Sequence, residues 1–139
     1  MRIGRKTLYK CRLNVPEISN QIWYDSSVKM VFPVLKVSFY QSQSGAEPVR
    51  EWLKELPAHE RQAIGEDIKS VQFRWPLGMP LVRKLTGKVW EVRTQLPTRI
   101  ARVLFTVKRD NMVLLHAFIK KTQATSPQDI ALAQSRIDF

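Results

Sequence analysis

Hydrophobic side chains recur at every second position in several segments of the chain, which is the pattern of a strand with one buried face. The first segment is residues 34–40, where Leu35, Val37 and Phe39 share one side. The other strands are predicted in pairs around two short turns, at residues 81–85 and 89–94 and at residues 99–107 and 112–119. The last strand is apolar on both faces, so we expect it to lie in the interior of the sheet.

Helical spacing of apolar residues marks the segments between Pro48 and Pro57 and between Pro57 and Pro76. A third helix is predicted to begin at Ser126, which can cap it, with a proline in the first turn and Asp129 at the third helical position. This order of elements favours an α+β fold. We expect an antiparallel sheet of three to five strands, two N-terminal helices packed on one face, and a C-terminal helix.

Composition narrows the class of protein. Of the 139 residues, 44% are hydrophobic, which suits one domain with a buried core and excludes a globally disordered chain. Cys11 has no partner in the chain, so a disulfide scaffold is excluded. The longest apolar run, residues 112–119, is too short to cross a bilayer, and residues 1–10 lack the apolar stretch of a secretory signal. We therefore expect a cytoplasmic protein that does not use a membrane.

The first 33 residues differ in character from the rest. They hold six Lys or Arg and two acids, and their aromatic residues follow no steady period. Two interpretations remain open: a basic N-terminal arm that is poorly ordered alone, or a true start at Met30. In both cases residues 34–139 form the folded domain.

Positive charge is concentrated in the second half of the chain. The formal net charge is +11, and residues 83–121 hold ten bases and two acids, whereas residues 47–67 hold three bases and six acids. A polyanion is therefore the expected partner, and nucleic acid or the ribosome is the usual one.

Alternation along the strands predicts where some of these charges lie. One sheet face is expected to be open and to gather Glu91, Arg93, Arg102, His116, Phe118 and Lys120, with Lys121 at its rim. The opposite, buried face is expected to receive apolar residues that include Val103, Phe105, Val113 and Leu115. A register slip of one residue in any strand would scatter both groups.

The charged group suits the cleavage of RNA, whose 2′-OH is an internal nucleophile and needs no metal. Cations would stabilise the charge that develops on the phosphate, and Phe118 would stack on an unpaired base. His116 or Glu91 would accept the proton of the 2′-OH. Like-charge repulsion eases proton loss from a lysine among cations, so Lys120 or Lys121 is a candidate acid or base.

Four further bases of this region are candidate RNA contacts: Arg83, Lys84, Lys88 and Arg99. No Cys/His pair, carboxylate cluster or Gly-rich loop argues for a metal, nucleotide or flavin, so we expect no cofactor.

Each candidate also has a purely structural interpretation. Glu91 and Arg93 would then be a solvent-facing pair, and His116 a hydrogen-bonded, half-buried histidine. Phe118 would belong to the core, and residues 120–121 would only solubilise the end of a strand. The sequence leaves both interpretations open.

Several short motifs resemble the phage-derived branch of the RelE/HigB toxin family. They are Glu51-Trp52-Leu53, Trp75-Pro76-Leu77-Gly78-Met79-Pro80, Trp90-Glu91-Val92-Arg93, Arg99-Ile100-Ala101-Arg102-Val103 and His116-Ala117-Phe118-Ile119-Lys120-Lys121-Thr122 with Pro127. Each motif is weak alone, but they follow in order over residues 37–137.

The resemblance implies a RelE-like fold and a type II toxin that cleaves mRNA, generally on the ribosome. It also implies a cognate antitoxin, which in HigB-like pairs commonly carries a helix-turn-helix domain. Arg93, Arg102, Lys120 and Lys121 match basic positions of the family. The chain has no Tyr after Tyr40, so the proton-transfer roles stay open between His116, Glu91 and the lysines. Two rival functions are a non-enzymatic, gyrase-directed inhibitor on the same fold and a phage nucleic-acid-binding accessory protein.

Overall fold

A computed structural model describes residues 9–11, 22–24 and 30–137 of the chain. Its elements are β1 (Tyr9–Cys11), β2 (Ile22–Tyr24), β3 (Met30–Val31), β4 (Lys36–Phe39), α1 (Pro48–Glu55), α2 (Ala58–Arg74), β5 (Val82–Thr86), β6 (Val89–Gln95), β7 (Ile100–Lys108), β8 (Asn111–Ile119) and α3 (Pro127–Ser135). The class is α+β, and the prolines lie where they were expected: Pro48 is in the first turn of α1, and α1 and α2 end shortly before Pro57 and Pro76.

The main sheet has five strands in the order β4-β8-β7-β6-β5. Strands β5 to β8 pair antiparallel as a meander, and β8 lies in the interior as predicted. Strand β4 pairs with β8 in parallel, so the expected all-antiparallel sheet is wrong and the sheet is mixed. Alternation gave no sign of this, because it reports which face of a strand is buried and not its direction.

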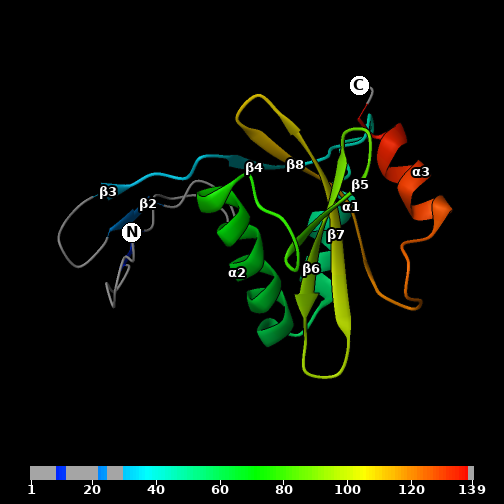
Figure 1. Ribbon diagram of the computed structural model, residues 1–139, viewed down its shortest axis with the longest axis horizontal. Coiled ribbons are helices and arrows are strands. Elements are labelled where there is room, and N and C mark those ends of the chain that lie inside the picture. The colour runs from blue at the N-terminus through cyan, green and yellow to red at the C-terminus, as the bar shows by residue number, and fades with distance from the viewer. Residues whose placement is uncertain (1–8, 12–21, 25–29, 138–139) are drawn as a thin grey trace.

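Helices cover the sheet from both sides, and α2 and α3 lie on opposite sides of β5–β8 in Figure 1. We call the side of α1 and α2 the first face and the side of α3 the second face. The first face holds the main core, in which Val49 and Leu53 of α1 and Ile64 and Ile68 of α2 are buried among residues of β6, β7 and β8. Among the described helices none is long and apolar enough to cross a membrane.

The second face holds a smaller core, in which Ala133 of α3 packs with Leu104, Val113 and Leu115. A bulge at Leu115 interrupts the pairing of β7 with β8, because Leu104 pairs with His116 and Phe105 already pairs with Leu114. The prediction that Val113 and Leu115 join the main core is therefore wrong. The bulge adds one residue and reverses the alternation of β8 before His116.

Strands β1, β2 and β3 form a separate three-stranded antiparallel sheet. Most of residues 1–33 lie outside the described part of the chain, so the basic-arm interpretation and the boundary at residue 33 stay predictions.

Candidate functional site

The strand register brings the predicted site residues of β6, β7 and β8 onto the second face. Arg93 pairs with Arg102, and Arg102 pairs in turn with Phe118. One step along, Leu104 lies between Glu91 and His116. The face is not open, however, because α3 and the segment that leads into it cover it.

Glu91 and Arg102 are the residues most affected by this cover, with exposed fractions of 0% and 1%. The Nη1 of Arg102 lies 3.6 Å from Oε2 of Glu91 and donates a hydrogen bond of 2.6 Å to Oγ1 of Thr125. The Thr125 hydroxyl donates to Oε2 of Glu91 in turn. The expectation that Glu91 and Arg102 face solvent is therefore wrong. The two opposite charges are buried together, while Oε1 of Glu91 and Nε of Arg102 have no hydrogen-bond partner among the described residues. Sheet periodicity alone could not show that a later segment covers the pair.

Arg93 keeps contact with solvent, because 27% of its side chain is exposed. Its Nε lies 4.0 Å from Oε1 of Glu91, the carboxylate oxygen that has no hydrogen-bond partner among the described residues. The three charged side chains thus form a row, Arg102–Glu91–Arg93, that runs from the interior to the surface.

His116 meets the first turn of α3. Its Nε2 lies 2.8 Å from Oδ1 of Asp129, and the Ser126 hydroxyl donates to Oδ2 of the same carboxylate at 2.6 Å. Burial acts to raise the pKa of Asp129, but the hydrogen bonds from Ser126 and His116 outweigh it and hold that pKa below its usual value. The Phe118 ring packs beside the imidazole with a centroid distance of 5.3 Å.

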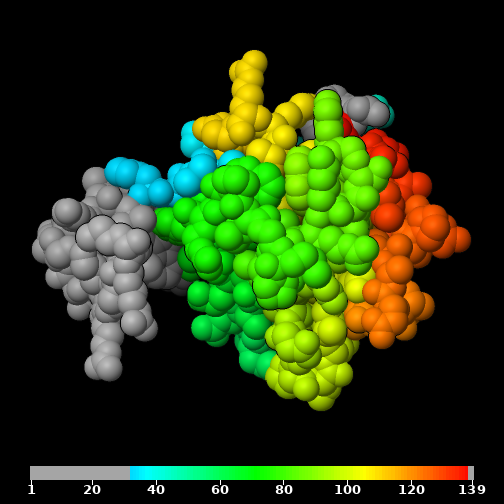
Figure 2. Space-filling model, viewed as in Figure 1, coloured from blue at the N-terminus to red at the C-terminus, as the bar shows by residue number. Residues whose placement is uncertain are grey.

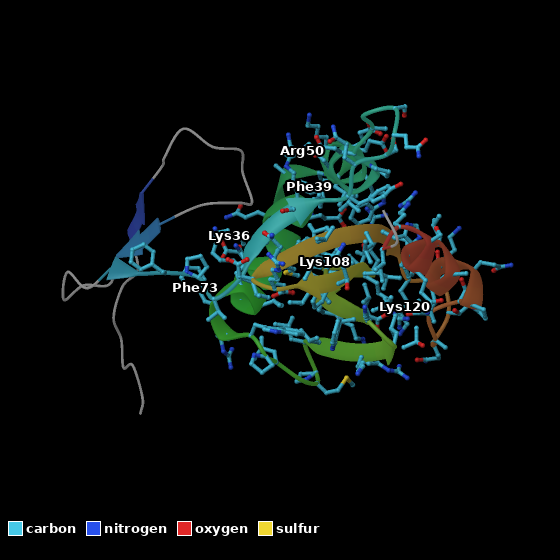
Figure 3. All side chains as sticks on the ribbon, turned by 90° about the horizontal axis from the view of Figure 1, so that it is seen from above. Lys36, Phe39, Arg50, Phe73, Lys108 and Lys120 are labelled. Carbon is cyan, nitrogen blue, oxygen red and sulfur yellow. The ribbon has the colours of Figure 1, made fainter. Side chains whose placement is uncertain are left out.

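A cleft of about 330 Å³ opens between the end of β8 and the start of α3. It is lined by Arg102, Phe118, Ile119, Lys120, Lys121, Thr122, Ala124, Ser126 and Asp129. Most of these residues belong to residues 120–126, which we call the cleft loop. In Figure 2 this orange segment lies beside the yellow-green β6–β7 hairpin, and Figure 3 places Lys120 next to α3.

Two more hollows continue from the cleft around the same end of the sheet. One of about 660 Å³ shares Lys120, Lys121 and Thr122 with the cleft and adds Arg99. Another of about 330 Å³ adjoins it through shared Gln95 and Ile100 and is lined by Arg93, Asp67, Pro80 and Leu81. The three hollows therefore form one continuous series, which is bordered by the solvent-accessible basic residues Arg93, Arg99, Lys120 and Lys121. The basic residues of β5 and of the turn after it do not border this series.

Arg99 also has a structural partner that sequence reasoning did not foresee. Its Nε and Nη2 donate hydrogen bonds of 3.0 and 2.6 Å to the two carboxylate oxygens of Glu60, at the start of α2. The hydrogen bond from Arg99 lowers the pKa of Glu60. This fork ties the β6–β7 hairpin to α2.

The remaining predicted RNA contacts are dispersed. Arg83 is exposed on β5, in register with Glu91. Lys84 points to the first face, where its Nζ lies 5.6 Å from the centre of the Trp90 ring. Lys88 lies in the turn before β6, at the far end of the sheet from the cleft loop. Among the described residues no group of three or more His, Cys, Asp or Glu is placed to hold a metal ion.

Two residues of the site were missed at the level of sequence. Asp129 was identified only as part of a helix start, and Thr125 lies in a loop without periodicity. The capping pattern around Ser126 correctly predicted the start of α3. No pattern along the chain predicts with which strand the hydroxyl of a loop residue such as Thr125 forms a hydrogen bond.

A comparison with protein families matches residues 51–138 to the model of the phage-derived protein Gp49-like family (DUF891). No curated protein matches the chain. The matched span includes α2, strands β5 to β8, the cleft loop and α3, and therefore every residue of the cleft. The chain belongs to the Gp49-like family of phage-derived proteins, a member of the RelE/HigB-like toxin superfamily.

Proposed function

We propose that the protein is the toxin of a toxin–antitoxin pair and a metal-independent endoribonuclease that cleaves mRNA. The observation that carries the proposal is the cleft between β8 and α3, where Lys120 and Lys121 lie with the aromatic Phe118 and the carboxylate of Asp129. Membership of the Gp49-like family supports it, because RelE-type toxins, to which the family is related, are ribonucleases.

The chemistry needs a cation at the phosphate and two proton transfers. The 2′-oxygen loses its proton and attacks phosphorus, the bond to the 5′-oxygen breaks, and that oxygen takes up a proton. We assign the phosphate contact and the donation of a proton to Lys120 and Lys121. The hydrogen-bonded pair of His116 and Asp129, of which Asp129 lines the cleft, replaces the buried Glu91 as the acceptor of the first proton.

Arg93 and Arg102 have different parts in this proposal. Arg93 is partly exposed beside the hollow that adjoins the lysines, so it contacts the RNA strand on one side of the cleaved bond. Arg102 is buried and acts through the residues that it holds. Phe118 is half-buried in the second core, and the part of its ring that lines the cleft contacts one base.

The partners follow from the resemblance to RelE/HigB toxins and from the charge. We propose that the mRNA is cut on the ribosome in the cytoplasm, and that a cognate antitoxin with a helix-turn-helix domain neutralises the protein.

Purified protein, incubated with ribosomes carrying a defined mRNA, tests this proposal by primer extension across the message. The wild-type protein is expected to produce new 5′ ends, and the double variant Lys120→Ala/Lys121→Ala is expected to produce none. Lys54→Ala, an exposed residue of α1, is the control for loss of a positive charge. Intact mRNA with the wild-type protein, or equal cleavage by the double variant, would contradict the proposal.

A further inference from the structure

The cleft loop has a single buried residue. All of residues 120–126 are described, and only Thr125, with 9% of its surface exposed, falls in the buried class. Lys121 to Ala124 are all exposed. A loop that is otherwise in solvent is therefore held to the body of the protein through few contacts, and their positions decide where its lysines stand.

Those contacts converge on one buried guanidinium. Arg102 donates through Nη1 to the Thr125 hydroxyl at 2.6 Å and through Nη2 to the main-chain oxygen of Gln123 at 2.8 Å. The same hydroxyl donates its proton to Glu91. A hydroxyl suits this place because it accepts one hydrogen bond and donates another, which is what a link between a guanidinium and a carboxylate requires.

The loop is fixed at its beginning as well. The main-chain nitrogen of Lys120 donates to the oxygen of Ile100 at 2.8 Å, which continues the pairing of β8 with β7. Lys121 and Thr122 therefore form a short arch between an anchor on β7 and the anchors at Gln123 and Thr125. The partners in these hydrogen bonds, Ile100 and Arg102 of β7 and Glu91 of β6, all belong to the main sheet, so the bonds restrict the movement of the arch.

We propose that Thr125 is a positioning residue for the cleft, an inference that rests on the proposed function. Its hydroxyl locks the cleft loop onto the buried Arg102–Glu91 pair and so fixes Lys121 at the mouth of the cleft. Thr125 touches no substrate, and its effect on cleavage passes through the loop. A displacement of about 1 Å at a group that acts on the transition state costs on the order of a hundredfold in rate.

The test compares Thr125→Val, which has nearly the same shape without the hydroxyl, with Thr125→Ser, which keeps the hydroxyl. Two quantities are measured well below the melting temperature of each variant: hydrogen exchange of the Lys120 amide, whose hydrogen bond to Ile100 fixes the beginning of the loop, and kcat for RNA cleavage. Val49→Ala serves as the matched control, because it opens the first core beneath α1 and lowers stability away from the second face.

For Thr125→Val we expect exchange of this loop amide to rise, and kcat to fall by about tenfold or more. Thr125→Ser is expected to restore both to within about threefold of the wild-type values, since the hydrogen-bonded chain is kept. Val49→Ala is expected to melt at a lower temperature with unchanged loop exchange and kcat, so general loss of stability cannot imitate the result.

The inference is overturned if Thr125→Val leaves loop exchange unchanged, or if Thr125→Ser is as impaired as Thr125→Val. A wild-type protein that leaves RNA intact contradicts the proposed function instead. The exchange measurement needs no RNA, and it then still decides whether Thr125 orders the loop.

Discussion

At the scale of single residues, burial separates side chains of the same chemistry. Arg93 and Arg102 are paired in register on neighbouring strands and both approach Glu91, yet one is 27% exposed and the other 1%. A guanidinium that is removed from water needs protein partners, and Glu91, Thr125 and the oxygen of Gln123 meet the two Nη atoms of Arg102, whereas its Nε has no hydrogen-bond partner among the described residues. Arg102 therefore stabilises the fold, whereas Arg93 is accessible to a ligand.

The two arginines are accordingly expected to respond differently to removal. Arg102→Ala leaves the Glu91 carboxylate buried without its cation, which costs about 3–5 kcal/mol of the free energy of unfolding. Arg93→Ala is expected to lower that free energy by less than Arg102→Ala does, because Arg93 is partly exposed and Glu91 keeps Arg102 as its cation, while RNA cleavage falls. Urea denaturation and a cleavage assay on both variants measure this. A stable Arg102→Ala protein or an unfolded Arg93→Ala protein would show that the assignment is wrong.

Asp67 on α2 gives a second prediction at this scale. Burial raises the pKa of Asp67 and outweighs the hydrogen bond from Thr94, which lowers that pKa, while the neighbouring Glu66 carboxylate adds to the rise. A raised folded-state pKa means that the ionised carboxyl opposes folding at pH 7, whereas below its unfolded pKa near 3.8 both states are protonated and the cost disappears. Asp67→Asn is therefore expected to raise the melting temperature at pH 7.

The control for Asp67→Asn is Glu55→Gln, an exposed acid on α1. Melting curves at pH 7 and pH 3 are compared for the three proteins. The increase in melting temperature caused by Asp67→Asn should disappear at pH 3. Glu55→Gln should have a melting temperature close to that of the wild-type protein at pH 7. A lower melting temperature for Asp67→Asn than for the wild-type protein at pH 7 would contradict the claim that the ionised Asp67 carboxylate opposes folding.

At the scale of elements, α3 packs on the second face of the sheet and so forms the cleft together with β8. The first turn is fixed twice: the Asp129 main-chain nitrogen donates to the Ser126 hydroxyl at 3.1 Å, and the Asp129 side chain bonds to His116 of β8. Ala133 then packs against the second core. The N-terminal turn of α3 therefore forms one wall of the cleft, and the end of β8 forms the other.

Loss of the helix cap should destabilise the first turn of α3. Ser126→Ala is expected to lower the free energy of unfolding by about 1 kcal/mol, the usual cost of removing a serine cap. Ser135→Ala, at the exposed end of the same helix, is the matched control and should have a much smaller effect. Urea denaturation of both variants measures the difference. Equal midpoints for the two variants would mean that the cap does not hold the helix.

Much of this architecture could be predicted from the sequence, and the exceptions have physical causes. The proline positions and the Ser126 cap gave helix starts, because these residues act through local backbone geometry. Period-two patterns gave strands β5 to β8 within one residue at each end. The parallel direction of β4 and the bulge at Leu115 were missed, because both depend on a partner strand that is distant in the sequence.

The candidate site was harder to predict for the same reason. Alternation placed Glu91, Arg93, Arg102 and His116 on one face, because register within a sheet follows from the pleat. It did not show that the face is covered, since cover depends on where α3 returns. The partners that decide the chemistry are nonlocal: Thr125 is 34 positions from Glu91, and Glu60 is 39 positions from Arg99.

At the scale of the whole molecule, part of the excess positive charge is concentrated at one end of the main sheet. Arg93, Arg99, Lys120 and Lys121 border the run of hollows at one end of the sheet. Lys36 and Lys108 lie away from α3 and Lys120 in Figure 3. A strand of RNA that follows the hollows would pass all four of the first group, and counterion release would then make its binding strongly dependent on salt.

This arrangement predicts a measurable salt slope. For single-stranded RNA each lost phosphate contact lowers the slope of log K against log salt by about 0.7, so Lys120→Ala/Lys121→Ala should lower it by about 1.4. Lys54→Ala should leave the slope unchanged. Binding is measured with 2′-O-methyl RNA, which cannot be cleaved because its nucleophile is blocked. An unchanged slope for the double variant would place the RNA elsewhere on the protein.

The most direct test of the central claim is to induce the protein in cells and map mRNA 5′ ends within minutes. Cleavage of mRNA at the cleft predicts new 5′ ends inside translated regions with the wild-type protein. These ends should be absent with Lys120→Ala/Lys121→Ala and present with Lys54→Ala. Growth arrest with intact mRNA would contradict the claim and point to a non-enzymatic inhibitor, and new ends that persist in the double variant would show that the cleft is not the site of cleavage.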